Sequence, residues 1–185
     1  MTSSVSLGKF CKTLAAKQAT PGGGAAAAVG GAIGAASASM SAAYTQRKKD
    51  VDSGAAHKAS DLIGSMDFEK LLKAADDDAE AYANLQRTWK EDMDAAEKQA
   101  IESRALAVPT NLVESCHSHI CEIHKFLPVC NPNITSDAKV GIHLLAGAAR
   151  SAYQTVLVNS PPDEEKLRLM SLLNDIRKIE DEILA

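Results

Sequence analysis

Residues 20–46 read TPGGGAAAAVGGAIGAASASMSAAYTQ, and this stretch decides the fold. The three glycines Gly22–Gly24 interrupt helical structure, so they separate one helix from the next. Beyond them, small residues recur at every fourth position: Ala26, Gly30, Gly34, Ala38 and Ala42. This spacing lines one side of a helix with small side chains, which lets neighbouring helices approach closely. We expect a helix from about Ala25 to Asp50, in the middle of a bundle or at a dimer interface.

The composition supports a helical fold. The chain has 185 residues, including 32 alanines and 11 glycines but only 7 aromatic residues. Sheet proteins normally contain more aromatic and β-branched residues, so helices are favoured. The length fits one domain, and we treat residues 1–185 as a single unit.

Helical periodicity and helix breakers divide the rest of the chain. An apolar stripe predicts a first helix over Val5–Gln18. A third helical region is expected at Ala55–Lys90 with a break near Gly64 and Asp67, and a fourth at Asp94–Phe126 with a kink at Pro109. A fifth helix is expected from a cap at Thr135 or Ser136 to Asn159, and a sixth runs to the end after a break at Ser160–Asp163. Leu127–Asn133 is expected to be a loop, and Leu71, Ala75, Tyr82, Leu85 and Trp89 are expected to mark the buried side of the third region. The sequence therefore predicts an all-α bundle of five to six helices around a central Ala/Gly-rich helix.

Charge and cysteine content narrow the setting. The net charge of −4 gives no reason to expect nucleic acid or an anionic membrane as a partner. Gln18–Gln46 carries no charge and is long enough to span a bilayer, but its large apolar residues are few, which favours burial inside protein. Four cysteines without a secretory signal are typical of reduced thiols, so we expect a cytoplasmic protein.

Two segments could bind a ligand or perform chemistry on pattern alone. Gly22–Gly24 lies at a helix start, where free backbone N–H groups can bind an anion or a polar ring edge, although a simple turn has the same pattern. Asp76, Asp77, Asp78 and Glu80 could supply a general base, although a solvated acidic face is the commoner outcome.

Two further segments contain candidate metal-ligating or acid–base residues. His117, Cys121 and His124 share a helix face and could hold zinc, but no second ligand cluster completes the site. Asn131–Asp137 forms a loop that leads into a helix, and Asp137 in the first turn is favourable electrostatically without any function.

No single segment of the sequence identifies a known family, but five segments taken together do resemble one. They are Ala19–Gly24 with the alanine-rich helix and Arg47-Lys48-Lys49, Asp76–Tyr82, Val108-Pro109, Asn131 with Ser136-Asp137, and Ala152-Tyr153 with Val156 and Asn159. In order and spacing the chain resembles the cyclodeaminase/cyclohydrolase family of folate enzymes. That family includes the cyclodeaminase domain of formiminotransferase-cyclodeaminase and stand-alone methenyltetrahydrofolate cyclohydrolases.

The resemblance implies a mostly up-and-down helical fold that dimerises. It implies a tetrahydrofolate derivative as substrate, with or without a polyglutamate tail, and neither a metal nor a further cofactor. The leading expectation is a formimidoyltetrahydrofolate cyclodeaminase, which forms 5,10-methenyltetrahydrofolate and releases ammonia. The alternatives are a methenyltetrahydrofolate cyclohydrolase and a non-catalytic helical dimer that binds folate or a partner.

The resemblance also assigns candidate site residues. Asp137 is expected to act as the acid–base group, with Asp78 as the second carboxylate and Lys49 as a charged partner. Substrate binding is expected from Gly22, Gly23, Gly24, Lys48, Asn131 and Asn159, and from Arg47 for the glutamate tail.

The chain departs from the family pattern at several of these segments. Ala25 replaces a serine, Arg47 a glycine and Thr155 an asparagine, and Thr88-Trp89-Lys90 stands where the family has Leu-Pro-Lys. Each change removes a polar group or a backbone freedom that could matter at a site, which leaves the non-catalytic alternative open.

Overall fold

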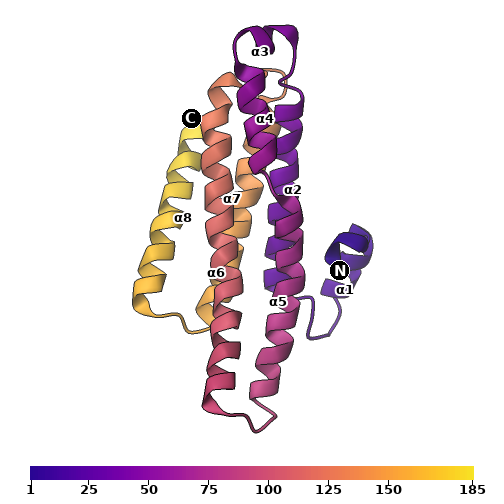
Figure 1. Ribbon diagram of the computed structural model, residues 1–185, viewed down its shortest axis with the longest axis vertical. Coiled ribbons are helices and arrows are strands. Elements are labelled where there is room, and N and C mark those ends of the chain that lie inside the picture. Colours follow the sequence, from indigo (N-terminus) through magenta and orange to yellow (C-terminus); the bar gives the residue numbers. More distant parts are fainter.

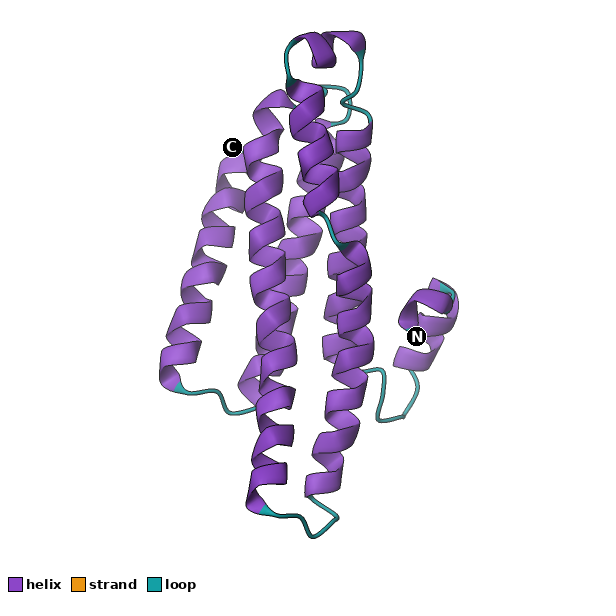
Figure 2. Ribbon diagram, in the orientation of Figure 1, coloured by secondary structure: helices purple, strands orange, loops and turns teal.

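The structure, a computed structural model, describes residues 1–185 apart from the side chain of Ser3, and over those residues it contains helices and no strand (Figures 1 and 2). The helices are α1 (Leu7–Leu14), α2 (Gly23–Ala43), α3 (Lys48–Asp52), α4 (Ala55–Ser65), α5 (Phe68–Thr88), α6 (Ala95–Phe126), α7 (Thr135–Val158) and α8 (Asp163–Leu184). Short 3-10 turns cover Thr2–Ser4 and Leu127–Val129. The expected all-α bundle is confirmed, and so is the break between α4 and α5.

The long helices run side by side along the length of the molecule, and α8 flanks α6 and α7 (Figure 1). Helix α2 packs closely against α4, α5, α6 and α7, as its small residues predict, and one of its faces stays exposed. Its closest neighbour is α7, where a Cβ added to Gly34 would lie 3.0 Å from the carbonyl oxygen of Gly141. The backbones of α2 and α7 therefore come into contact at a point where neither helix has room for a side chain.

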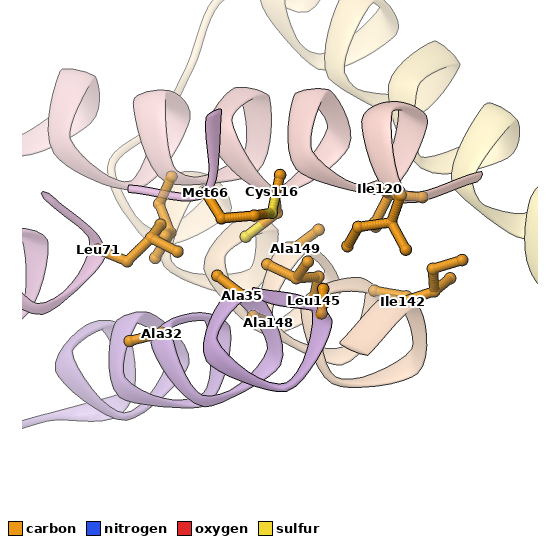
Figure 3. Packing of buried hydrophobic residues seen from close by; sticks show 14 of the residues in the cluster. Ala32, Ala35, Met66, Leu71, Cys116, Ile120, Ile142, Leu145, Ala148 and Ala149 are labelled. Atoms are coloured by element: carbon orange, nitrogen blue, oxygen red, sulfur yellow. The ribbon is translucent and has the colours of Figure 1, made fainter. Parts of the chain in front are cut away.

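The small residues of α2 face the core, and larger side chains from its neighbours fill the space around them. Figure 3 shows Ala35 of α2, Cys116 of α6 and Leu145 of α7 converging. All three are fully buried. Burial raises the pKa of the Cys116 thiol to about 12, so this cysteine acts as a small apolar core residue.

Several expected boundaries are wrong. Helix α2 ends at Ala43 and not at Asp50, because the buried Asn131 side chain donates to the Tyr44 carbonyl and Asn131 N–H donates to Thr45 Oγ1. These bonds hold the chain in a corner, after which α3 begins. The first helix spans only Leu7–Leu14.

Two expectations about α5 and α7 also need correction. Tyr82 and Trp89, the C-cap residue of α5, are exposed and not buried, because they lie on a side of the helix that faces an open groove. Neither Thr135 nor Ser136 caps α7: Ile134 is at the N-cap, and the Thr135 hydroxyl donates to the Asn131 carbonyl.

Within the described residues, α2 alone is long and apolar enough to cross a membrane. Of the window that meets this criterion, 61% is buried inside the fold. The central helix of a folded domain has the same length and composition, which matches the expectation of burial in protein.

Candidate functional site

A groove of about 990 Å³ lies beside the N-terminal half of α2, between α5 and α7. It is lined mainly by apolar and small residues from these three helices. Its principal polar and aromatic residues are Asp78, Tyr82, Trp89, His143, Ser151, Thr155 and Asn159, and its floor includes Gly22, Gly23, Gly24, Ala26, Gly30 and Gly147. A groove of this size accommodates a ligand of the size of a cofactor.

Asp78 joins α5 to the start of α2. Its Oδ2 accepts a hydrogen bond of 3.0 Å from the backbone N–H of Ala25. The N-cap residue of α2 is Gly22, which has no side chain to satisfy the free N–H groups of the first turn. Asp78 therefore caps α2 from another helix, and its negative charge lies at the positive end of the helix dipole.

Gly24 provides the space that Asp78 occupies. A Cβ added to Gly24 would lie 2.0 Å from Asp78 Oδ1, whereas one added to Gly22 or Gly23 would meet nothing within 4 Å. The last glycine of the run is thus required by packing, and the first two leave open backbone beside the groove.

The environment of Asp78 alters its acidity. Burial raises the pKa of the half-buried carboxyl above its usual 3.8, and the hydrogen bond from Ala25 opposes this only in part. A carboxyl group whose pKa is moved toward neutrality suits proton transfer better than an ordinary surface aspartate.

His143 is a groove residue that the sequence reasoning missed. Its Nδ1 lies 2.9 Å from Oε1 of Glu180 on α8, and Arg150 forms an ion pair with the same carboxylate. Burial alone would raise the pKa of Glu180, but the bonds from Arg150 and His143 outweigh it and lower the pKa. The ionised Glu180 fixes the orientation of the imidazole. The available signal was the spacing of His143 and Arg150, which places both on one face of a helix.

Asn159 lines the same groove, but its amide group already has partners. Its Nδ2 donates to the carbonyls of Ala105 and Thr155, both at 3.0 Å. The Ala105 carbonyl is free because its helical partner four residues later is Pro109, which has no N–H. The side chain of Asn159 thereby compensates for a proline in α6.

The remaining candidates lie at the other end of α2. Arg47 donates to Asn131 Oδ1 at 2.6 Å and pairs with Asp50 at 2.7 Å, which lowers the pKa of Asp50. Asp137 is half-buried at the start of α7, where its carbonyl accepts from Ser37 Oγ at 2.9 Å. Lys48 and Lys49 are exposed on α3.

The structure therefore divides the predicted site into two groups. Gly22–Gly24, Asp78 and Asn159 line the groove, while Arg47, Lys48, Lys49, Asn131 and Asp137 lie beyond the middle of α2. On α2, Gly24 lies beside the first group and Ser37 beside the second. At about 1.5 Å per residue along the helix, Gly24 and Ser37 are roughly 20 Å apart. Within one copy of the chain, Asp78 and Asp137 do not share a site.

The zinc alternative lacks a site in the described residues, where no three metal-ligating side chains cluster. His117 Nε2 lies 3.7 Å from Cys121 Sγ, but His124 points to Glu182, with 3.2 Å between Nε2 and Oε2.

The fold is an all-α bundle, and its groove is a candidate small-molecule site beside a carboxyl group of raised pKa. The sequence profile described as formiminotransferase-cyclodeaminase matches residues 6–177, and the chain belongs to this family. The fold is similar to the crystal structure of a formiminotetrahydrofolate cyclodeaminase from Thermotoga maritima, with a TM-score of 0.84 and 25% sequence identity over 98% of this chain and 93% of that one. No curated protein sequence gave a match. The resemblance inferred from the five segments is confirmed.

Proposed function

We propose that the protein is a 5-formimidoyltetrahydrofolate cyclodeaminase, which forms 5,10-methenyltetrahydrofolate and releases ammonia. The family and the similarity to the Thermotoga maritima protein support a tetrahydrofolate derivative as substrate. The observation that carries the assignment is Asp78, a carboxyl group of raised pKa held at the glycine-lined end of a groove large enough for that substrate.

The chemistry requires proximity and two proton transfers. Nitrogen-10 attacks the formimino carbon on nitrogen-5, and the tetrahedral intermediate then expels ammonia. The proton lost by nitrogen-10 needs an acceptor, and the departing amine needs a donor. Asp78 is proposed to perform these transfers, while the backbone at Gly22 and Gly23 holds the pterin ring. Keeping the two nitrogens close supplies much of the rate enhancement.

The second group of candidates points to a dimer. Ala26 and Gly30 of the groove share one face of α2 with Ile33, Ser37, Met40 and Tyr44, of which Ile33, Met40 and Tyr44 are exposed apolar residues. Val140 and Leu144 of α7 add to this apolar face. One group of candidate site residues lies at each end of this apolar face. A two-fold axis through the middle of the face would therefore place the first group of one copy against the second group of the other copy. We propose that the partner subunit's Asp137 and Lys49 complete the groove in this way.

An absorbance assay for methenyltetrahydrofolate tests the proposed reaction. With 5-formimidoyltetrahydrofolate supplied, we expect the methenyl product to accumulate together with ammonia, and Asp78→Asn to abolish it. Decay of supplied methenyltetrahydrofolate, without formation from the formimidoyl compound, would indicate a cyclohydrolase. Binding without turnover of either compound would indicate the non-catalytic alternative.

A further inference from the structure

An exposed aromatic pair forms one wall of the groove. Tyr82 on α5 and Trp89 at its C-cap pack edge to face, with ring centroids 6.3 Å apart and planes at 81°. Together with Leu85 they lie at i, i+3 and i+7, so all three face the groove from one side of the helix. Trp89 is the single tryptophan of the chain.

Both rings of the pair are open to solvent on the groove side. Trp89 is 63% exposed and Tyr82 is 38% exposed, although large aromatic side chains normally gain stability from burial. The edge of one ring restrains the other without covering both of its faces. An open aromatic face inside a groove is suited to stacking on a planar ring of a ligand.

Position and polarity indicate which ring of the substrate would bind there. The open backbone at Gly22 and Gly23, beside Asp78, offers hydrogen-bonding groups that match a pterin, which has donors and acceptors on its edge. Trp89 lies eleven residues beyond Asp78, about 16 Å along α5, on a wall that Tyr82 and Leu85 make largely apolar. Side chains on a helix lean toward its N-terminus, so the Trp89 ring reaches back along the groove toward Asp78. The apolar wall fits the planar p-aminobenzoyl group better than the charged glutamate that follows it in the substrate.

We propose that Trp89, whose ring packs against Tyr82, stacks on the p-aminobenzoyl ring of the tetrahydrofolate derivative. This contact sets the affinity for the p-aminobenzoylglutamate portion of the ligand. The proposal rests on the proposed function for the identity of the ligand. At Trp89 this chain departs from the Leu-Pro-Lys pattern of the family, and the proposal gives the tryptophan at that position a role in binding.

Intrinsic fluorescence tests the contact directly because Trp89 is the only tryptophan. We expect p-aminobenzoylglutamate to quench the emission with saturation. A free tetrahydropterin, which lacks the benzoyl arm and does not absorb at the emission wavelengths, should leave it nearly unchanged. Trp89→Ala should raise the Kd for p-aminobenzoylglutamate, measured by calorimetry, roughly tenfold, while Trp89→Phe should stay near the native value. Leu167→Ala, an exposed position on α8 outside the groove, should bind as the native protein does.

Native affinity in Trp89→Ala, or calorimetric binding of p-aminobenzoylglutamate without any quenching, would overturn the proposal. Quenching by the free tetrahydropterin alone would overturn the choice of ring. Circular dichroism of each variant separates a folding defect from a lost contact. None of these measurements needs turnover, so a protein that fails the methenyltetrahydrofolate assay still gives a decisive answer.

Discussion

At the scale of single residues, the site depends on the missing side chain of Gly24. The space that a Cβ would fill contains the Asp78 carboxyl group, which caps α2 through Ala25. The run of three glycines predicts either a ligand-binding loop or a simple turn. Which of the three is sterically required depends on a residue 54 positions later in the chain, and no local pattern shows it.

We predict that Gly24→Ala displaces Asp78 and destabilises the protein by about 1–3 kcal/mol. Gly23→Ala is the matched control, because its Cβ would meet nothing and alanine favours a helix by roughly 0.5–1 kcal/mol. Urea denaturation of both variants measures the difference. Equal stability of the two variants would contradict the packing argument.

The raised pKa of Asp78 gives a prediction for pH. A carboxyl group whose pKa is raised by folding contributes stability that is present below its unfolded pKa and is lost as pH rises through its folded pKa. Asp78→Asn keeps an oxygen acceptor for Ala25 but does not ionise. We expect its melting temperature, relative to the native protein, to increase between pH 4 and pH 8. A constant difference across that range would show that Asp78 ionises as freely in the folded state as in the unfolded one.

At the scale of elements, periodicity predicted the long helices well because each buries one apolar face. It failed at the α2–α3 corner, where tertiary hydrogen bonds from Asn131 to Tyr44 and Thr45 end the helix. It also failed for Tyr82 and Trp89, whose apolar spacing predicts burial that the bundle does not provide. Sequence periodicity shows which side chains share a face, but not whether another helix covers it.

The link between α6 and α7 supports a double-mutant test. Asn159→Ala leaves the Ala105 carbonyl without its donor and should cost about 1–3 kcal/mol. In a Pro109→Ala background the backbone N–H of residue 109 can bond that carbonyl, so the same Asn159 change should cost much less. Denaturation of the two single variants and the double variant gives the coupling energy. Additive costs would show that Asn159 does not compensate for the proline.

At the scale of the whole molecule, the sequence predicted one site, and its pattern does not show that the candidate residues lie in two separate groups. Both are close to α2 in sequence or in space, and only the length of that helix separates them. The exposed apolar face between them is also invisible in the pattern, since Ile33, Met40 and Tyr44 have the helical spacing of core residues.

The proposed dimer predicts complementation between inactive variants. Asp78→Asn and Asp137→Asn should each lack activity alone. In random mixed dimers half of the molecules hold one intact site of two, so refolding the two together should restore about one quarter of the native activity. A fully active Asp137→Asn variant would remove that residue from the site.

Ile33→Glu places a charge on the apolar face and should yield a monomer by light scattering.

The bond between Asn159 and the Ala105 carbonyl also restricts the order in which this sequence can change during evolution. Losing the asparagine first leaves a buried acceptor without a donor, whereas losing Pro109 first restores the helical bond and makes the asparagine dispensable. A lineage that exchanges both residues is therefore expected to pass through the proline substitution, and the two positions should vary together among its descendants.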